Sequence, residues 1–272
     1  MEKPLVTVLV TAYNSRYLTE TIRSVDSQKY SPLELVVIDD GSNPPLKDTL
    51  PRMKDHELRY FFIEHKGFPH GLIRGMKEAK GKYVAILDHD DILTENSILS
   101  RANALENNPN AAFAYGDVVY INSSGKEYGR NNFKQYDDKN EFIKDVLLKP
   151  FGPITHTTVM FKKECIDAVG GYDEKNKRLF DTDLILKLAQ RYSMIKLNED
   201  VIKYRTHNFN ASKSFEHKIK SIPYKLEAID KYLKSDYNNW DYKAKLIFWQ
   251  TLKAVYSLVS FARPKTLIAL LK

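Results

Sequence analysis

Short apolar runs alternate with helical stripes along residues 5–110. The runs are rich in Val, Ile, Leu and aromatic residues, which is typical of strands buried on both faces, and they lie at 5–10, 33–38, 58–63 and 83–87. Between them, apolar residues recur at the spacing of one helix face, at Leu18, Ile22 and Val25 and again at Leu72, Met76 and Ala79. Strands that alternate with helices predict an α/β, Rossmann-like fold with a mainly parallel sheet flanked by helices.

Two residues mark where helices are expected to end and begin. Gly81 follows the second stripe and is a candidate C-cap, because glycine adopts the left-handed conformation at low cost. Thr94 opens a helix expected over 94–109 and is a candidate N-cap, because its hydroxyl oxygen can accept a backbone N–H.

Beyond residue 110 the alternation loosens. We predict strands at 111–121 and 157–161, separated by a polar stretch that holds a loop and a short helix. A helix over 162–171 is expected to end at Gly170 and Gly171, and a second helix follows at 181–192. The stretch 194–207 predicts a further strand.

The last part of the chain differs from the rest. A heptad-like apolar stripe predicts a helix there, formed by Phe248, Leu252, Val255, Val259 and Ala262. The stripe suits packing on the main domain, a homo-oligomer through this helix, or peripheral contact with a membrane. Residues 216–272 hold 11 Lys and Arg against 5 Asp and Glu, so they carry six of the seven net positive charges. Such a tail attracts anionic partners, but no nucleic-acid-binding motif accompanies it and we expect no nucleic acid.

The composition says more about the cellular compartment of the protein than about its chemical function. With 272 residues and 43% hydrophobic content, the chain can bury a sizeable core. Cys165 is the single cysteine, which excludes a disulfide framework and fits a reducing cytoplasm. The opening MEKPLVTVLV lacks a signal-peptide pattern, and no apolar run approaches the roughly 20 residues that span a bilayer. We therefore expect a cytoplasmic protein, peripheral at the inner face of the membrane if the tail binds lipid.

An acidic cluster directly follows the fourth run, in AILDHDDIL at 85–93. Side chains at i and i+2 of an extended segment point the same way, so Asp88 and Asp90 can reach one ligand, with His89 between them. A divalent cation such as Mg2+ or Mn2+ prefers oxygen ligands and commonly bridges carboxylates to phosphates. The alternative is a solvated turn whose acids cap a helix, the role we expect for Asp91.

Other candidate residues also follow predicted strands or begin a helix. Asp39 and Asp40 precede a glycine turn, where they can accept a ligand's N–H or hydroxyl groups or simply form a polar turn. His207 follows the last strand and could complete a metal or phosphate site, although a lone histidine is more often a surface residue. Asp181 can act as a general base towards a hydroxyl or stabilise the start of its helix.

Taken in order, these stretches resemble the family-2 glycosyltransferases with the GT-A fold. The resemblance rests on VTVLVTAYNSRYLTETIRSVDSQ, LELVVIDDGS, KGKYVAILDHDDIL, VGGYDE with FDTDLILKLAQ, and YRTH. It covers about residues 4–210. We therefore expect a GT-A glycosyltransferase domain over 1–214 and a C-terminal helical, basic extension over 215–272.

The resemblance implies a role for each matching residue. Thr11, Ala12 and Tyr13 look like the segment that cradles the nucleotide base, and Asp40 is similar to the acid that reads the base, usually uracil. Asp88 looks like the carboxylate near the ribose. Asp90 looks like the carboxylate on the metal, and His207 resembles the histidine that holds metal or diphosphate. Asp181 sits where the family keeps its catalytic base, and His89 is expected near the donor sugar.

Two positions depart from the family's pattern. The acidic residue that usually precedes the base is Phe180 here, which puts the positioning of Asp181 in question. An Arg-Asn pair often found in the third helix corresponds to Leu72 and Ile73, with Arg74 directly after.

The implied activity is inverting transfer of a sugar from a nucleotide-diphosphate donor, most simply a UDP-sugar with Mn2+ or Mg2+, to a hydroxyl of a glycan, lipid-linked or protein-linked acceptor. A catalytically silent relative that binds nucleotide sugars or glycans is the first alternative, supported by Phe180. A nucleotidyltransferase is the second, but LVTAYNSRYL lacks the glycine-rich phosphate loop that such enzymes use.

Overall fold

A computed structural model describes residues 2–149, 152–207, 220–233, 243–244 and 247–248. The strands are β1 (Val6–Ala12), β2 (Leu33–Asp40), β3 (Glu57–Ile63), β4 (Tyr83–Asp88), β5 (Ile92–Leu93), β6 (Ala111–Ile121), β7 (Glu127–Asn131), β8 (Met160–Lys162) and β9 (Ser193–Arg205). The helices are α1 (Leu18–Asp26), α2 (His70–Glu78), α3 (Ser97–Glu106), α4 (Lys139–Leu148), α5 (Lys163–Ala168), α6 (Phe180–Arg191) and α8 (Ile222–Tyr232). Short 3-10 turns lie at Leu46–Thr49 and His156–Thr158.

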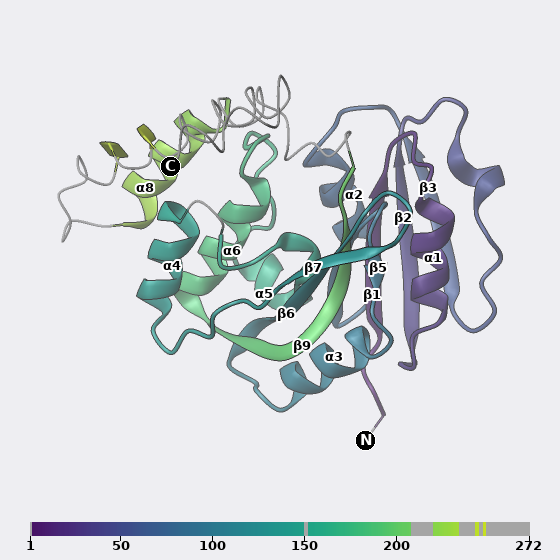
Figure 1. The fold of residues 1–272 in the computed structure, drawn as a ribbon, viewed down its shortest axis with the longest axis horizontal. Coiled ribbons are helices and arrows are strands. Elements are labelled where there is room, and N and C mark those ends of the chain that lie inside the picture. The colour runs from purple at the N-terminus through teal and green to yellow at the C-terminus, as the bar shows by residue number, and fades with distance from the viewer. Residues whose placement is uncertain (1, 150–151, 208–219, 234–242, 245–246, 249–272) are drawn as a thin grey trace.

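The strands form one curled sheet in the order β3-β2-β1-β4-β8-β6-β9-β5, with β7 paired to β6 (Figure 1). The first half, β3-β2-β1-β4, is parallel as the alternating pattern predicts. In the second half β8 runs antiparallel to both β4 and β6, while β6 and β9 are parallel. At the carboxyl end of β1, Thr11 pairs with Ile38 on one side and Asp88 on the other, so three strand ends meet at one edge.

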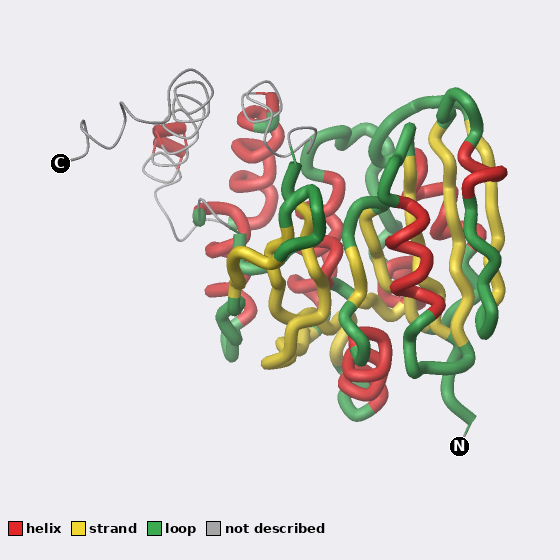
Figure 2. The backbone as a smooth tube through the Cα atoms, turned by 45° about the vertical axis from the view of Figure 1, so that its right-hand side comes forward, coloured by secondary structure: helices red, strands yellow, loops and turns green. Residues whose placement is uncertain are grey.

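Helices cover both faces of the sheet (Figure 2). One core packs α2, α4, α5, α6 and α8 against the sheet, and the other packs α1 and α3 against its opposite face. The apolar stripe predicted for α1 faces the hydrophobic core, since Leu18, Ile22 and Val25 are buried. The mixed α/β architecture expected from the sequence is thus confirmed.

Both predicted helix caps are wrong. Helix α2 ends at Glu78 and its cap residue Ala79 is extended, so Gly81 lies beyond the helix. A Cβ at Gly81 would stand 2.5 Å from the backbone nitrogen of Thr7, which shows that glycine is needed there for close approach to β1. Helix α3 begins only at Ser97, because the hydroxyl of Thr94 donates to the carbonyl of Asp200 instead of capping.

The region from 122 to 162 holds elements that the pattern did not separate. Strand β7 was not predicted, because its sequence EYGRN is polar and almost wholly exposed and therefore has no apolar alternation. The strand expected at 157–161 is shorter and displaced, since its first part forms the 3-10 turn before β8. The short helix expected in this region is α4, whose Phe142, Ile143 and Leu147 are buried.

Beyond residue 214, helix α8 packs on the main domain rather than standing apart. Its Ile229 and Tyr232 are buried in the same core as α4 and α6. The buried carboxylate of Asp183 on α6 anchors this contact: it accepts a hydrogen bond from Tyr232 Oη at 2.6 Å and forms ion pairs with Lys187 and Lys231 at 2.7 and 2.9 Å. The predicted boundary at 214 stays a prediction.

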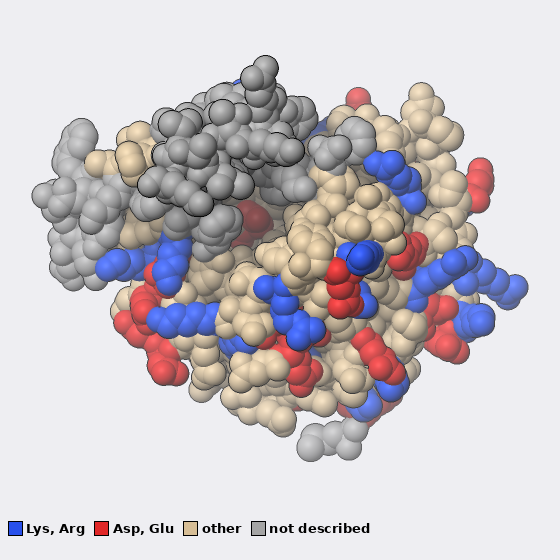
Figure 3. Space-filling model, in the orientation of Figure 1, with Lys and Arg blue, Asp and Glu red and all other residues tan. Residues whose placement is uncertain are grey.

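The apolar stripe from 248 to 262 falls outside the described residues except for Phe248, which is 61% exposed. Its three predicted roles therefore stay predictions. Within the described part of the chain, basic and acidic side chains are interspersed on the face drawn in Figure 3. None of the described helices combines the length and the apolar character that crossing a membrane requires.

We expect Asp183→Asn to lower the free energy of unfolding by about 2 kcal/mol at neutral pH, because it removes the charge that pairs with Lys187 on the same helix and with Lys231 across the α6–α8 contact. Denaturant unfolding measures this. The matched control is Asp167→Asn, which breaks an exposed ion pair with Lys163 on one helix and should change stability by at most about 0.5 kcal/mol. Equal effects of the two variants would contradict the anchoring role.

The same contact makes stability depend on pH. Burial raises the pKa of Asp183, but hydrogen bonds and ion pairs from Lys187, Tyr232 and Lys231 outweigh it and hold the pKa below its ordinary value. The ionised group thus contributes stability that is fully present above the unfolded pKa of about 4 and is lost as the pH falls through the lower folded-state pKa. We expect the stability difference between wild type and Asp183→Asn to shrink below about pH 4, and a constant difference would contradict this.

Candidate active site

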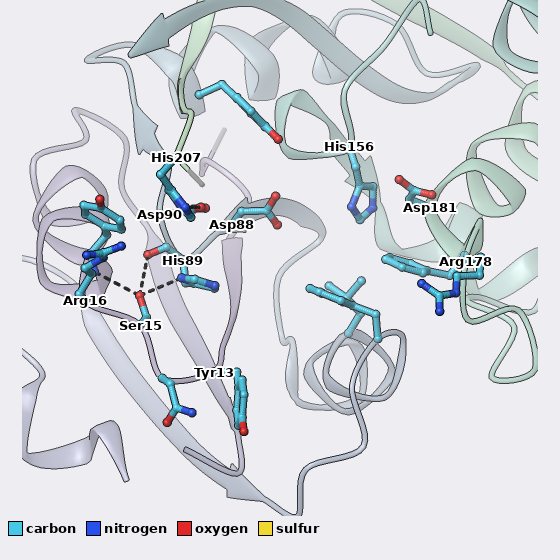
Figure 4. A pocket seen from close by; sticks show the side chains of 16 residues that line it. Tyr13, Ser15, Arg16, Asp88, His89, Asp90, His156, Arg178, Asp181 and His207 are labelled. Carbon is cyan, nitrogen blue, oxygen red and sulfur yellow. Dashed lines mark hydrogen bonds and ion pairs between the residues drawn. The ribbon is translucent and has the colours of Figure 1, made fainter. Parts of the chain in front are cut away.

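A cavity of about 820 Å³ opens where the carboxyl ends of β1 and β4 meet (Figure 4). Its remaining walls come from the start of α2, the turn before β8, the loop leading into α6 and the end of β9. The lining residues are Tyr13, Asn14, Ser15, Arg16, Tyr17, Phe68, Leu72, Asp88, His89, Asp90, His156, Arg178, Phe180, Asp181, Tyr204 and His207. Six predicted site residues thus lie around one cavity, namely Tyr13, Asp88, His89, Asp90, Asp181 and His207.

Three carboxylates converge at the end of β4. One oxygen atom from each of Asp88, Asp90 and Asp91 lies within 4.8 Å of the other two. Burial, together with the charges of Asp90 and Asp181, raises the pKa of Asp88 to about 7. Burial and the charges of Asp88 and Asp90 also raise the pKa of Asp91. Because crowded carboxylates repel each other in a site of low dielectric constant, a hard divalent cation fits this cluster.

The two predicted metal ligands are in direct contact. His207 Nε2 lies 2.8 Å from Asp90 Oδ2, and both side chains are largely buried. The ring of Tyr17 stacks on the imidazole of His207 with centroids 5.4 Å apart. The end of β9 is therefore joined to the acidic loop after β4, although the two segments are more than 100 residues apart.

Asp91 does not cap a helix, contrary to prediction. Its buried carboxylate accepts the backbone N–H of Arg205 at 2.8 Å and the hydroxyl of Thr157 at 3.1 Å. The buried guanidinium of Arg205 donates from Nε to the carbonyl of Asp90 at 2.8 Å and pairs with Glu20 at 2.6 Å. Arg205 thus fixes the backbone of the loop that presents Asp90.

His89 is held by the loop after β1. Its Nδ1 lies 2.8 Å from the hydroxyl oxygen of Ser15, and burial lowers its pKa. The imidazole therefore favours the neutral form and lines the cavity between the two strand ends (Figure 4).

The segment predicted to hold a nucleotide base is only partly in the cavity. The ring of Tyr13 is 45% exposed and stacks on His65 with centroids 4.1 Å apart, so one aromatic face is available to a ligand. Thr11 and Ala12 are buried in β1 and do not line the cavity. Their predicted contact with the base stays a prediction.

Asp40 lies outside the cavity lining as well. Its carboxylate accepts the backbone N–H groups of Lys66 and Gly67 at 3.0 and 2.9 Å and pairs with His65 at 2.9 Å. It therefore shapes the loop after β3 that carries His65 beneath Tyr13. Its predicted role in recognising a nucleotide base stays a prediction.

Asp181 stands in the first turn of α6, across the cavity from Asp90 and His207 (Figure 4). Beside it, His156 Nε2 lies 2.9 Å from Tyr172 Oη. Burial lowers the pKa of His156 and raises that of Tyr172, so both groups favour their neutral forms. Opposite the Asp88–Asp90 cluster, the cavity thus offers the carboxylate of Asp181 beside aromatic groups and the guanidinium of Arg178 (Figure 4).

The positions that depart from the family's pattern have separate environments. Phe180 lines the cavity and stacks on Phe68 with centroids 5.3 Å apart and planes 9° apart. Leu72 also lines the cavity, whereas Arg74 turns to Glu78 at 2.9 Å and lies over the ring of Phe61.

Sequence reasoning missed several cavity residues. Ser15 and Tyr17 lie two and four residues after Tyr13, so their proximity to that motif was a usable signal. His156 had none, because it reaches the cavity only through the antiparallel pairing of β8 with β4. Arg205 lies in the YRTH motif outside the cavity lining, and the motif predicts no role for it, because its partners Asp90 and Glu20 are distant in sequence.

The model of the family "Glycosyl transferase family 2" matches residues 7–170, which is more than half of the chain. The chain belongs to this family. This glycosyltransferase is 29% identical over 218 residues to an uncharacterized glycosyltransferase of Methanocaldococcus jannaschii, with 76% of this chain and 73% of the relative covered. It is 27% identical over 216 residues to an uncharacterized glycosyltransferase of Rickettsia typhi, covering 75% of this chain and 65% of that protein.

Solved structures of glycosyltransferases share the fold of this enzyme. Staphylococcus aureus TarS (residues 1–349) in complex with UDP-GlcNAc superposes with a TM-score of 0.61 at 17% identity, covering 90% of this chain and 71% of that one. The mannosyltransferase PcManGT of Pyrobaculum calidifontis, in complex with GDP-Man and Mn2+, superposes with a TM-score of 0.58 at 21% identity, covering 96% and 76%. The GT-A fold expected for this glycosyltransferase is therefore confirmed.

We expect Arg205→Lys to weaken Mn2+ binding by this glycosyltransferase about tenfold, because a lysine ammonium cannot reproduce the hydrogen bonds that orient the loop of Asp90. Calorimetric titration with Mn2+ measures this. Arg130→Lys is the matched control, since Arg130 is 57% exposed in a surface ion pair with Asp200. Unchanged Mn2+ affinity in Arg205→Lys would contradict the positioning role.

Proposed function

We propose that this enzyme is an inverting glycosyltransferase that moves a sugar from a nucleotide-diphosphate donor, with UDP as the preferred nucleotide, to a hydroxyl of a carbohydrate-containing acceptor. The observation that carries the proposal is the arrangement of one cavity. A carboxylate cluster lies on one side of it, an aromatic ring lies beside the cluster, and a single carboxylate stands opposite.

The nucleotide is proposed to bind over the ends of β1 and β2. The exposed face of Tyr13 can stack on the base, while His65 supports the ring from behind. Thr11 and Ala12 supply backbone to this segment, and Asp40 is proposed to recognise an N–H of uracil. The complex of TarS with UDP-GlcNAc supports UDP only as a fold-level analogy.

Asp90 and His207 are proposed to hold Mn2+ or Mg2+, with Asp88 beside them near the ribose. The crowding of the carboxylates and the raised pKa of Asp88 support a cation here. When bound, the ion supplies positive charge that stabilises the leaving diphosphate. The chain's own contribution is to fix these ligands, which Arg205 does through the carbonyl of Asp90. His89 is proposed to face the donor sugar.

Asp181 is proposed to act as the general base. It would take the proton of the acceptor hydroxyl as the hydroxyl oxygen bonds to the anomeric carbon. The bond from that carbon to the diphosphate oxygen breaks with its electron pair leaving on the diphosphate. Since Asp181 stands across the cavity from Asp90 and His207, the attack comes from the face opposite the leaving group, which inverts the anomeric configuration (Figure 4).

We also propose an acceptor class and a location for the reaction. A glycan, lipid-linked or glycoprotein acceptor is consistent with the open cavity. The basic residues beyond 215 would suit an acceptor at the cytoplasmic face of a membrane, or an interface with a second copy.

We expect metal-dependent turnover of one donor from a panel of UDP-, GDP- and dTDP-sugars. Released nucleoside diphosphate is measured with Mn2+, with Mg2+ and with EDTA. Asp181→Asn should lower turnover at least about 100-fold, because general-base catalysis contributes that much. Asp167→Asn, an exposed acid on α5, should retain wild-type turnover.

Retained turnover in Asp181→Asn would contradict the assignment of the base. Donor binding without turnover in the wild type, with or without acceptor extracts, would favour a catalytically silent relative instead.

Asp90→Ala tests the cation site separately. We expect this variant to lose the difference in donor affinity between Mn2+ and EDTA that the wild type shows, because a metal ligand is missing. Equilibrium binding of UDP under both conditions measures it. UDP binding that is indifferent to both EDTA and Asp90→Ala would refute a metal-bridged diphosphate.

A further inference from the structure

The side of the cavity that carries Asp181, called the acceptor side below, holds aromatic side chains for which general-base catalysis gives no reason. Phe68 and Phe180 both line it, and they belong to different segments, the loop before α2 and the first residue of α6. Their rings stack with centroids 5.3 Å apart and planes 9° apart. One face of Phe68 therefore packs on Phe180, yet the Phe68 side chain remains 44% exposed.

Neighbouring rings fix the orientation of this pair. Phe180 meets His156 and Tyr172 with centroids 6.2 Å from each and planes steeply inclined. His156 and Tyr172 are themselves joined through Nε2 and Oη at 2.9 Å. Phe68 thus rests on a packed set of aromatic side chains, so its open surface is held in place before any ligand arrives.

A second contact joins the same two segments. His70, two residues after Phe68, pairs with Glu174 at 3.1 Å, and Glu174 lies in the loop that leads to Phe180. The two loops are therefore linked both beside the cavity, through the stacked rings, and at the start of α2.

Exposed aromatic surface beside a polar group is the composition of a sugar-binding subsite. A pyranose ring carries its C–H bonds on one face and its hydroxyls around the edge. The face can lie on Phe68, while an edge hydroxyl can bond to the neutral imidazole of His156 or to Asp181. Lipid phosphates and peptide hydroxyls lack such a face.

We propose that Phe68, supported by Phe180, is the stacking platform for the terminal pyranose of the acceptor, so that the acceptor's reactive unit is itself a sugar. The inference rests on the proposed function in one respect, since Asp181 marks the acceptor side. Phe180 directly precedes Asp181, which sets the platform beside the hydroxyl to be activated. Phe180 acts as a positioning residue.

Saturation-transfer NMR on the full chain tests this with methyl pyranosides of glucose, galactose, mannose and N-acetylglucosamine, each with and without UDP and Mn2+. We expect at least one glycoside to bind with strongest transfer to ring C–H protons. Phe68→Ala should weaken its binding about tenfold, Phe68→Tyr should restore it, and Phe180→Leu should weaken it less than Phe68→Ala does.

The control variant is Phe62→Ala, which removes a ring that is 51% exposed on β3 and does not line the cavity. UDP affinity is measured for every variant and should stay within about twofold of wild type in Phe68→Ala, which also shows that the variant is folded.

Three outcomes would overturn the inference. The first is a wild type that binds UDP but no glycoside. The second is an equal loss of glycoside binding in Phe62→Ala and Phe68→Ala. The third is a loss of UDP affinity in Phe68→Ala that matches its loss of glycoside affinity, because this would assign the ring of Phe68 to the donor site. A wild type that binds a glycoside on Phe68 but binds no nucleotide would refute the proposed donor and leave the sugar platform standing.

Discussion

The cavity depends on one buried cation, the guanidinium of Arg205. It reaches from the end of β9 to the carbonyl of Asp90 and to Glu20 on α1, while its backbone N–H is accepted by Asp91. Three segments distant in sequence are thereby held at the edge of the sheet. A buried charge is costly unless it is paired and hydrogen-bonded, so the partners of Arg205 must keep these positions. The conformation of the loop that carries Asp90 and Asp91 is thereby fixed.

That geometry explains how the chain tolerates carboxylates crowded at a strand end. Asp90 pairs with His207, and Asp91 accepts an N–H and a hydroxyl, while burial and the neighbouring carboxylates keep the pKa values of Asp88 and Asp91 raised. The charge that remains faces the cavity. The donor proposed for this enzyme has a diphosphate as its leaving group, and a divalent cation held by these carboxylates would meet it at this side of the cavity.

The opposite wall shows what a departure from a family's pattern can mean. Phe180 stands where an acid is usual, yet Asp181 keeps its place in the first turn of α6. The apolar ring is not a defect of packing, because it stacks on Phe68 and meets His156 and Tyr172. A specialised acceptor surface accounts for it better than loss of activity does.

The sequence alone determined the parallel half of the sheet, the strand ends that carry Asp88 and Asp90, and the family, because local apolar periodicity and ordered motifs report these directly. The predicted caps at Gly81 and Thr94 are wrong. Gly81 is needed for the close approach to the backbone of Thr7, and the hydroxyl of Thr94 donates to the carbonyl of Asp200. Only the tertiary structure placed His156 at the cavity and Arg205 against the loop of Asp90, because antiparallel pairing of β8 with β4 and the return of β9 bring together residues that no spacing along the chain connects. The order and direction of the strands decide which side chains meet across a sheet, and both depend on the packing of the whole chain.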